Sequence, residues 1–164
     1  MTATYEKIAT QTLGSDTNTV TFSSISGSYT DLIVIADSNS TGSNNIQLRF
    51  NNDSGTNYSQ TRLYGDGSTA ASDRHSNQTS IPFVAGTVNS TTLRANYIAQ
   101  IQNYSNTTTF KTALIRSNSS SLYVMAVVGL YRSTSAITRI DLICGDAANF
   151  RSGSTFTIYG IKAE

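Results

Sequence analysis

The sequence predicts an all-β protein, a two-sheet antiparallel β-sandwich of jelly-roll type with about ten strands. Residues that usually fill helix surfaces are scarce, because the 164-residue chain contains only 2 Glu, 3 Lys and 2 Met. β-branched and aromatic residues recur instead in runs of roughly five to ten, separated by clusters of Ser, Asn and Gly. Many short strands joined by polar turns are typical of a sandwich or a barrel, and we prefer the sandwich.

The expected strands follow one another along the whole chain, which has the length of one domain, residues 1–164. The sequence contains neither a Pro-rich linker nor an internal repeat of fixed period. We expect strands over Tyr5–Thr12, Thr19–Phe22, Asp31–Asp37, Asn45–Phe50, Tyr58–Tyr64, Ser80–Val84, Leu93–Tyr104, Thr109–Ser117, Leu122–Arg132, Ile137–Cys144 and Ser154–Lys162.

Apolar periodicity indicates where these strands lie in the sheets. In "IQLRF", residues 46–50, the apolar side chains alternate with polar ones, as expected of a strand with one buried face. "DLIVIAD", residues 31–37, and "YVMAVVGLY", residues 123–131, are apolar on both faces, which predicts central strands with something packed over each face. Pro82 in "SIPFV" marks an edge strand, because proline cannot donate a hydrogen bond to a ladder.

Composition restricts the possible partners. Ser, Thr and Asn contribute 24, 24 and 14 residues, whereas charged residues make up only 13% of the chain, about half the usual share. The net charge of +1 argues against nucleic-acid binding and against attachment to an anionic membrane surface. The start of the chain has no apolar signal-peptide region and no apolar stretch is long enough to span a bilayer, so we expect synthesis in the cytoplasm.

Cys144 lies in the apolar run "IDLIC" and is expected to be buried.

The residues that could support catalysis form no recognisable site, so we predict a non-enzymatic protein without a cofactor. The single histidine, His75, is expected in an exposed polar loop two residues after Asp73, and the chain has no G-x-S-x-G motif. Asp53 and Asp66 adjoin Gly, Ser or Asn, where aspartate normally forms turns through its own backbone. A weak calcium site near Asp53 or Asp66 remains an alternative to these plain turns.

The segment "RFNNDSGTNYSQTRLYGDGS", residues 49–68, is interpreted as two turns around an edge strand. Tyr58, Arg62 and Tyr64 share one face of that strand, with Gln60 between them. Tyr and Arg are enriched at the centres of protein interfaces, so these three residues are candidates for a contact surface. Aromatic cover for the end of the sheet is the alternative interpretation.

An ordered set of segments resembles a module of virion proteins from tailed bacteriophages. The segments are "YEKIATQTLGSDTNTVTFSSI", "SYTDLIVIA", "LRFN" with the "NY" and "LYGDGS" that follow it, "NYSNTTTFKT" and "GSTFTIYGIK", and together they cover nearly the whole chain. The resemblance implies a β-sandwich that is often trimeric, that has no catalytic residues and that resides in the virion. Neither Gly-X-Y repeats nor heptads, the usual signs of a fibre shaft, are present.

We therefore expect a capsid decoration protein that contacts copies of itself, as a homotrimer, and other virion proteins such as the major capsid protein. A tail-fibre or host-receptor-binding module, with a host surface glycan as its partner, is the main alternative. A carbohydrate-binding module of another kind is the third. The number of copies in the particle and their place on head or tail would separate the first two.

Overall fold

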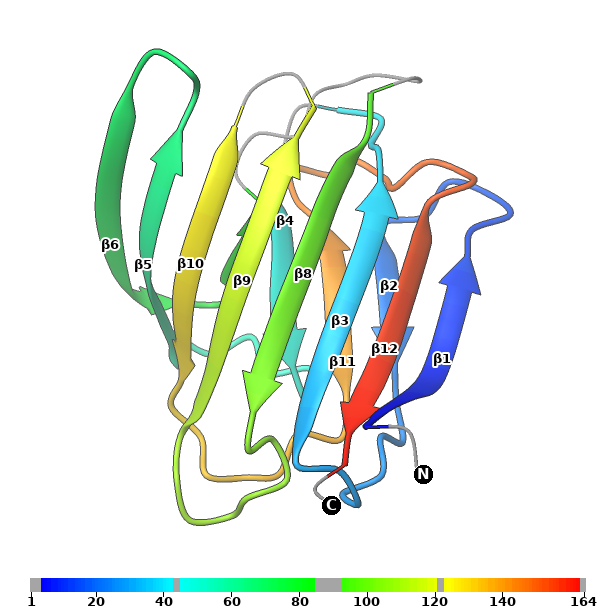
Figure 1. Ribbon diagram of the computed structural model, residues 1–164, viewed down its shortest axis with the longest axis vertical. Helices are drawn as coiled ribbons and strands as arrows, with labels where there is room; N and C mark the ends of the chain where they lie inside the picture. The colour runs from blue at the N-terminus through cyan, green and yellow to red at the C-terminus, as the bar shows by residue number, and fades with distance from the viewer. Residues whose placement is uncertain (1–3, 43–44, 85–92, 121–122, 163–164) are drawn as a thin grey trace.

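The computed structural model describes residues 4–42, 45–84, 93–120 and 123–162, with the side chains of residues 83 and 84 excepted. The described residues form two antiparallel sheets that lie face to face, the larger in front of the smaller in Figure 1. The larger sheet has the strand order β1 (Tyr5–Thr12), β12 (Thr155–Ile161), β3 (Asp31–Ser38), β8 (Ala95–Gln102), β9 (Lys111–Ser119), β10 (Val124–Tyr131), β5 (Tyr58–Gly65), β6 (Ala70–Gln78). The smaller has the order β2 (Thr19–Phe22), β11 (Ile140–Cys144), β4 (Ile46–Phe50), β7 (Ile81–Val84).

The predicted fold class is confirmed: the described chain is an all-β antiparallel sandwich, wound as a jelly roll. Successive parts of the chain pass from one sheet to the other, so most neighbours in a sheet are distant in sequence. β3 pairs with β8 and with β12, and β11 pairs with both β2 and β4. None of the described residues forms a helix that is long and apolar enough to cross a membrane.

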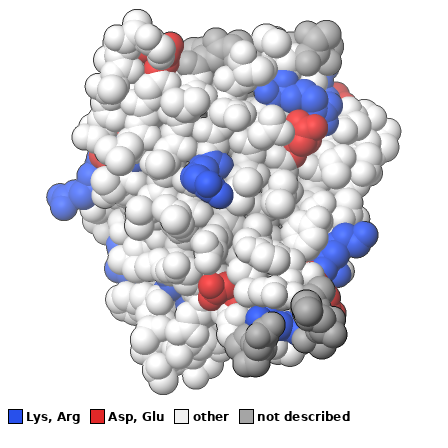
Figure 2. All heavy atoms as spheres, viewed as in Figure 1, with Lys and Arg blue, Asp and Glu red and all other residues white. Residues whose placement is uncertain are grey.

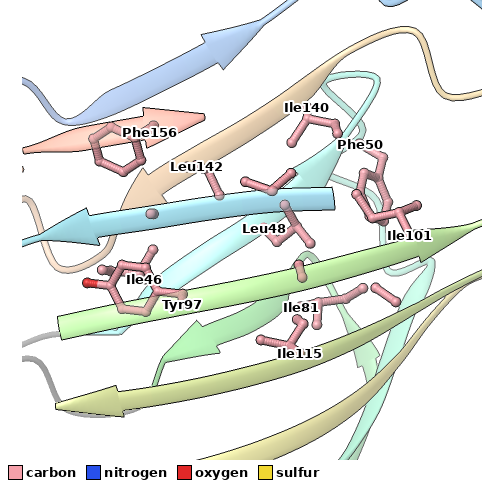
Figure 3. Close-up of a cluster of buried hydrophobic side chains, with 14 of the residues drawn as sticks. Ile46, Leu48, Phe50, Ile81, Tyr97, Ile101, Ile115, Ile140, Leu142 and Phe156 are labelled. Carbon is pink, nitrogen blue, oxygen red and sulfur yellow. The ribbon is translucent and has the colours of Figure 1, made fainter. Parts of the chain in front are cut away.

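Alternating side chains from both sheets fill the space between them, as Figure 3 shows. Leu48 and Phe50 of β4 point toward Ile101 of β8 and Ile115 of β9, and all four are fully buried. Cys144 is buried as predicted. Each fully buried aliphatic side chain contributes roughly 1.5–3 kcal/mol, so this shared layer is the main source of stability.

Two predictions about sheet edges have different outcomes. β7, which contains Pro82, is an edge strand of the smaller sheet, as predicted. Residues 58–64 do not form an edge, because β6 pairs along the outer side of β5. β6 was missed and His75 was wrongly assigned to a loop, since "AASDRHSNQ" lacks the apolar alternation by which a half-buried strand is recognised.

Candidate functional site

The hairpin of β5 and β6 carries a polar cluster on the face that turns toward the smaller sheet. Arg62 lies directly opposite Asp73 in the ladder, and Gln60 lies opposite His75, so all four side chains share this inner face. The Arg62 guanidinium donates through Nε to Asp73 Oδ1 at 2.6 Å and through Nη2 to Asp73 Oδ2. Its hydrogen bonds lower the pKa of the Asp73 carboxyl, and Asp73 in turn raises the pKa of Arg62.

His75 completes the cluster through a single ring nitrogen. Arg62 Nη2 lies 3.1 Å from His75 Nε2, and Asp73 Oδ1 lies 3.5 Å from the same atom. Since the guanidinium has no acceptor, a hydrogen bond between these two atoms has Nη2 as its donor and Nε2 as its acceptor, which requires the tautomer with its proton on Nδ1. In a hydrolytic triad the carboxylate and the nucleophile occupy different ring nitrogens. Here the guanidinium and the carboxylate both lie beside Nε2, and only the guanidinium can hydrogen-bond to it while Nε2 is an acceptor.

A cavity of about 220 Å³ opens beside this cluster, between the hairpin and the edge of the smaller sheet. The side chains that line it include Gln47, Gln60, Gln78, Arg62, His75 and Ser80. The cavity lies next to the contact between β7 and β10. At this contact Ile81 lies directly over Gly129, with no room for a Cβ between them. β7 also contacts β5, and β6 lies farther out at the edge of the larger sheet, so the cavity opens between β7 and the hairpin.

Gln60 is the most deeply buried of the polar side chains in this cavity. Its exposed fraction is 7%, and its amide oxygen Oε1 has no hydrogen-bond partner among the described residues. Sequence reasoning placed Gln60 on the correct face but gave it no role. The signal available in the sequence was a glutamine at a strand position whose side chain faces inward, where an apolar residue is usual.

The three predicted contact residues share the inner face of β5 but differ in environment. Tyr58 is fully buried, with its ring stacked on Tyr131 at 4.7 Å between centroids and its hydroxyl accepting from Phe50 N at 3.1 Å. Arg62 is held by Asp73, and its guanidinium carbon lies 5.9 Å from the centre of the Tyr64 ring. Only Arg62 and Tyr64 therefore have side chains that a partner could reach.

The two aspartates considered for calcium act as turn formers, as predicted. Asp53 accepts from Gly55 N at 2.8 Å, Asn57 Nδ2 at 2.9 Å and Tyr131 Oη at 3.0 Å. Asp66 Oδ1 accepts from the backbone of Ser68 and Thr69 in the turn between β5 and β6. Within the described ranges, no group of three or more His, Cys, Asp or Glu residues could hold a metal ion.

The outer face of the larger sheet forms a second candidate surface. Strand register places Ile35, Ile98, Arg116, Ala126 and Leu63 in one row across β3, β8, β9, β10 and β5. Large apolar side chains of this face are exposed, including Leu63 at 61%, Val124 at 64% and Val128 at 56%. Figure 2 shows this face with few charged groups, one basic group near its centre and the others toward its margins.

This exposure corrects the prediction that both faces of the central strands are covered. The inner faces of β3 and β10 are buried in the core, but none of the described residues forms a layer over their outer faces. Ile35 and Leu114 are 40% and 45% exposed. We call the outer face of β3, β8, β9, β10 and β5, with Ile35, Ile98, Leu114, Val128, Val124 and Leu63 as its apolar side chains, the outer apolar face.

Comparisons with known proteins show similarity to other β-rich chains. No family model and no curated protein sequence matches this chain. A galectin from Caenorhabditis elegans is similar over 94% of this chain and 96% of its own, with 9% identity and a TM-score of 0.36. An alginate lyase from Aplysia kurodai is similar over 83% of this chain and 72% of its own, with 9% identity and a TM-score of 0.28. Likenesses of this size carry no argument about ligand or activity, and the chain is assigned to the β-sandwiches by its own two sheets.

Proposed function

We propose that this protein is a non-enzymatic structural subunit of a bacteriophage virion, a capsid decoration protein, which self-associates through its outer apolar face. The observation that carries the proposal is the set of exposed aliphatic side chains on the outer apolar face, which surround the one arginine, Arg116, in the row across its five strands. Monomeric proteins rarely expose a continuous apolar surface of this kind, and large exposed patches mark interaction sites. The resemblance of the sequence to virion modules gives the setting.

The occupant that we propose for this face is a second copy of the chain. Charged side chains are few on the face, and the exposed Arg116 in its central row must keep water or a polar partner at the contact while the apolar side chains around it are buried. Burial of Val124, Val128 and Leu63 would contribute roughly 25 cal/mol for each Å² of apolar surface removed from water. The symmetry that we propose is a threefold axis, as the virion resemblance implies.

The oligomeric state tests this proposal directly. Light scattering on the purified protein should give about three times the chain mass of 17.6 kDa. Val124→Lys combined with Val128→Lys should reduce the mass to that of a monomer, because two ammonium groups would be buried at the contact. The matched control is Phe110→Lys, which adds a charge at an exposed large side chain that precedes β9. A wild-type monomer at micromolar concentration, or an oligomer unaffected by the double substitution, would contradict the proposal.

The setting in the virion needs a second experiment. Electron cryomicroscopy of intact particles, with density assigned to this chain, should show many copies on the head surface. A few copies on the tail would support the fibre or adhesin alternative instead. A particle without this chain would contradict both.

A further inference from the structure

We infer that the cavity between the β5–β6 hairpin and the edge of the smaller sheet binds a neutral, hydroxyl-rich ligand, one sugar ring in size. The cavity lies on the inner side of the larger sheet, opposite to the outer apolar face, so the two surfaces can work independently. The inference rests on three features of the site: an unpaired buried amide, its charge balance and its size.

The unpaired amide is the first feature. Gln60 is more than nine-tenths buried and lines the cavity, yet Oε1 has no donor among the described residues. A buried acceptor without a partner is destabilising, typically by the full desolvation free energy of the group. Oε1 is itself buried, so a ligand hydroxyl reaches it only after the Gln60 amide turns its oxygen toward the cavity; such a donor accounts for an amide at a position where an apolar side chain would pack without this penalty.

Charge balance is the second feature, and it determines the class of ligand. The Asp73 carboxylate neutralises Arg62 through two hydrogen bonds, and an imidazole that accepts from Arg62 carries no charge. The other side chains named at the cavity are amides and a hydroxyl. An anion would find no surplus positive charge, and a cation would find no free carboxylate. A ligand that both donates and accepts hydrogen bonds without charge fits this lining.

Size is the third feature. The cavity volume of about 220 Å³ lies below the range of about 300–1,000 Å³ that is usual for drug-sized ligands. It exceeds by several fold the roughly 30 Å³ that a water molecule occupies in the liquid. One pyranose ring, with hydroxyl groups around its edge, is of the appropriate scale.

Titration of the full-length protein with methyl glycosides of glucose, galactose and mannose tests this inference. Two-dimensional NMR should show the side-chain amide of Gln60 and the ring of His75 shifting with at least one glycoside, with a Kd on the order of 1 mM. Gln60→Met should weaken that binding by on the order of tenfold while leaving the melting temperature equal to or above that of the wild type. Gln78→Ala, at a half-buried position, provides a second variant that is not expected to disturb folding.

The matched control is Gln102→Met, which makes the same substitution on the outer face of β8 and should leave binding unchanged. Inorganic phosphate and acetate serve as anionic competitors. The inference would be overturned by the absence of shifts with all three glycosides, since the cavity then holds water only. Tighter binding of either anion, or glycoside binding that survives Gln60→Met and Gln78→Ala, would also overturn it. None of these results depends on the oligomeric state.

Discussion

At the scale of single residues, the hydrogen bonds of a buried polar side chain show whether that side chain stabilises the fold. The hydroxyl of Tyr58 is fully satisfied: it accepts from Phe50 N and lies 3.1 Å from the carbonyl oxygen of Asp53. Burial raises the pKa of this phenol, so it stays protonated and can donate to that carbonyl. Gln60, two residues further on, has an unpaired amide oxygen. The hydrogen bonds of Tyr58 therefore account for a polar group at that buried position, whereas no such bond accounts for the amide oxygen of Gln60.

Tyr58→Phe tests the structural role of that hydroxyl. The ring and its stacking on Tyr131 remain, but the acceptor for Phe50 N and the donor to Asp53 O are lost. We expect the free energy of unfolding to fall by about 1–3 kcal/mol, as measured by urea denaturation. Tyr5→Phe is the control, because Tyr5 is largely exposed, and it should change the stability by less than about 0.5 kcal/mol.

Asp53 should make the stability depend on acid pH. Hydrogen bonds from Asn57, Gly55 and Tyr131 lower the pKa of this carboxyl in the folded state. The stabilisation is therefore fully present above the unfolded pKa of about 3.9 and is lost as the pH falls through the lower, folded pKa. Asp53→Asn should reduce the difference in unfolding free energy between pH 6 and pH 3. An unchanged difference would show that the lost stability comes from other groups, such as Asp73.

At the scale of elements, the short edge strand β7 determines how the smaller sheet sits on the larger one. Ile81 of β7 is fully buried and lies over Gly129 of β10, where a Cβ would approach Ile81 Cδ1 to 2.6 Å. Glycine is needed here for close approach between sheets. Gln60 of β5 pairs with Gly129, so the cavity that Gln60 lines lies beside this contact.

Gly129→Ala should push β7 away from β10. We expect a loss of about 1–3 kcal/mol in the free energy of unfolding, because the methyl group overfills a packed site. Gly14→Ala is the control: a Cβ at Gly14 would have no neighbour within 4 Å, so this change should be neutral or slightly stabilising. Equal stability of the two variants would show that β7 can shift without loss.

At the scale of the whole molecule, the winding of the jelly roll joins strands that are far apart in the chain. β1 pairs with β12, so residues near the two ends of the described chain lie side by side, as Figure 1 shows. β2 pairs with β11, and β3 pairs with β8 and β12. Each of these pairings closes a long loop. The chain loses conformational entropy on closing the loop before the stabilising contacts between the strands can form.

Such a contact pattern predicts slow folding. In stopped-flow refolding, followed by tyrosine fluorescence, the main phase should take milliseconds to seconds, as for other all-β sandwiches. Refolding in microseconds would contradict the dominance of distant pairings. Refolding at several protein concentrations would separate chain folding from the proposed self-association, because only the latter depends on concentration.

The sequence by itself determined the all-β class, the positions of most strands, the edge position of Pro82 and the turn roles of Asp53 and Asp66. These features depend on local rules: alternation along a strand, the missing donor of proline and the side-chain hydrogen bonds of aspartate. The tertiary structure alone decided that β6 is a strand, because its polar residues are ordered by pairing with β5. It also decided which apolar faces are covered and that Gln60, Arg62 and His75 meet at one cavity. Both outcomes depend on which distant strands become neighbours, and periodicity within a strand carries no information about its partner.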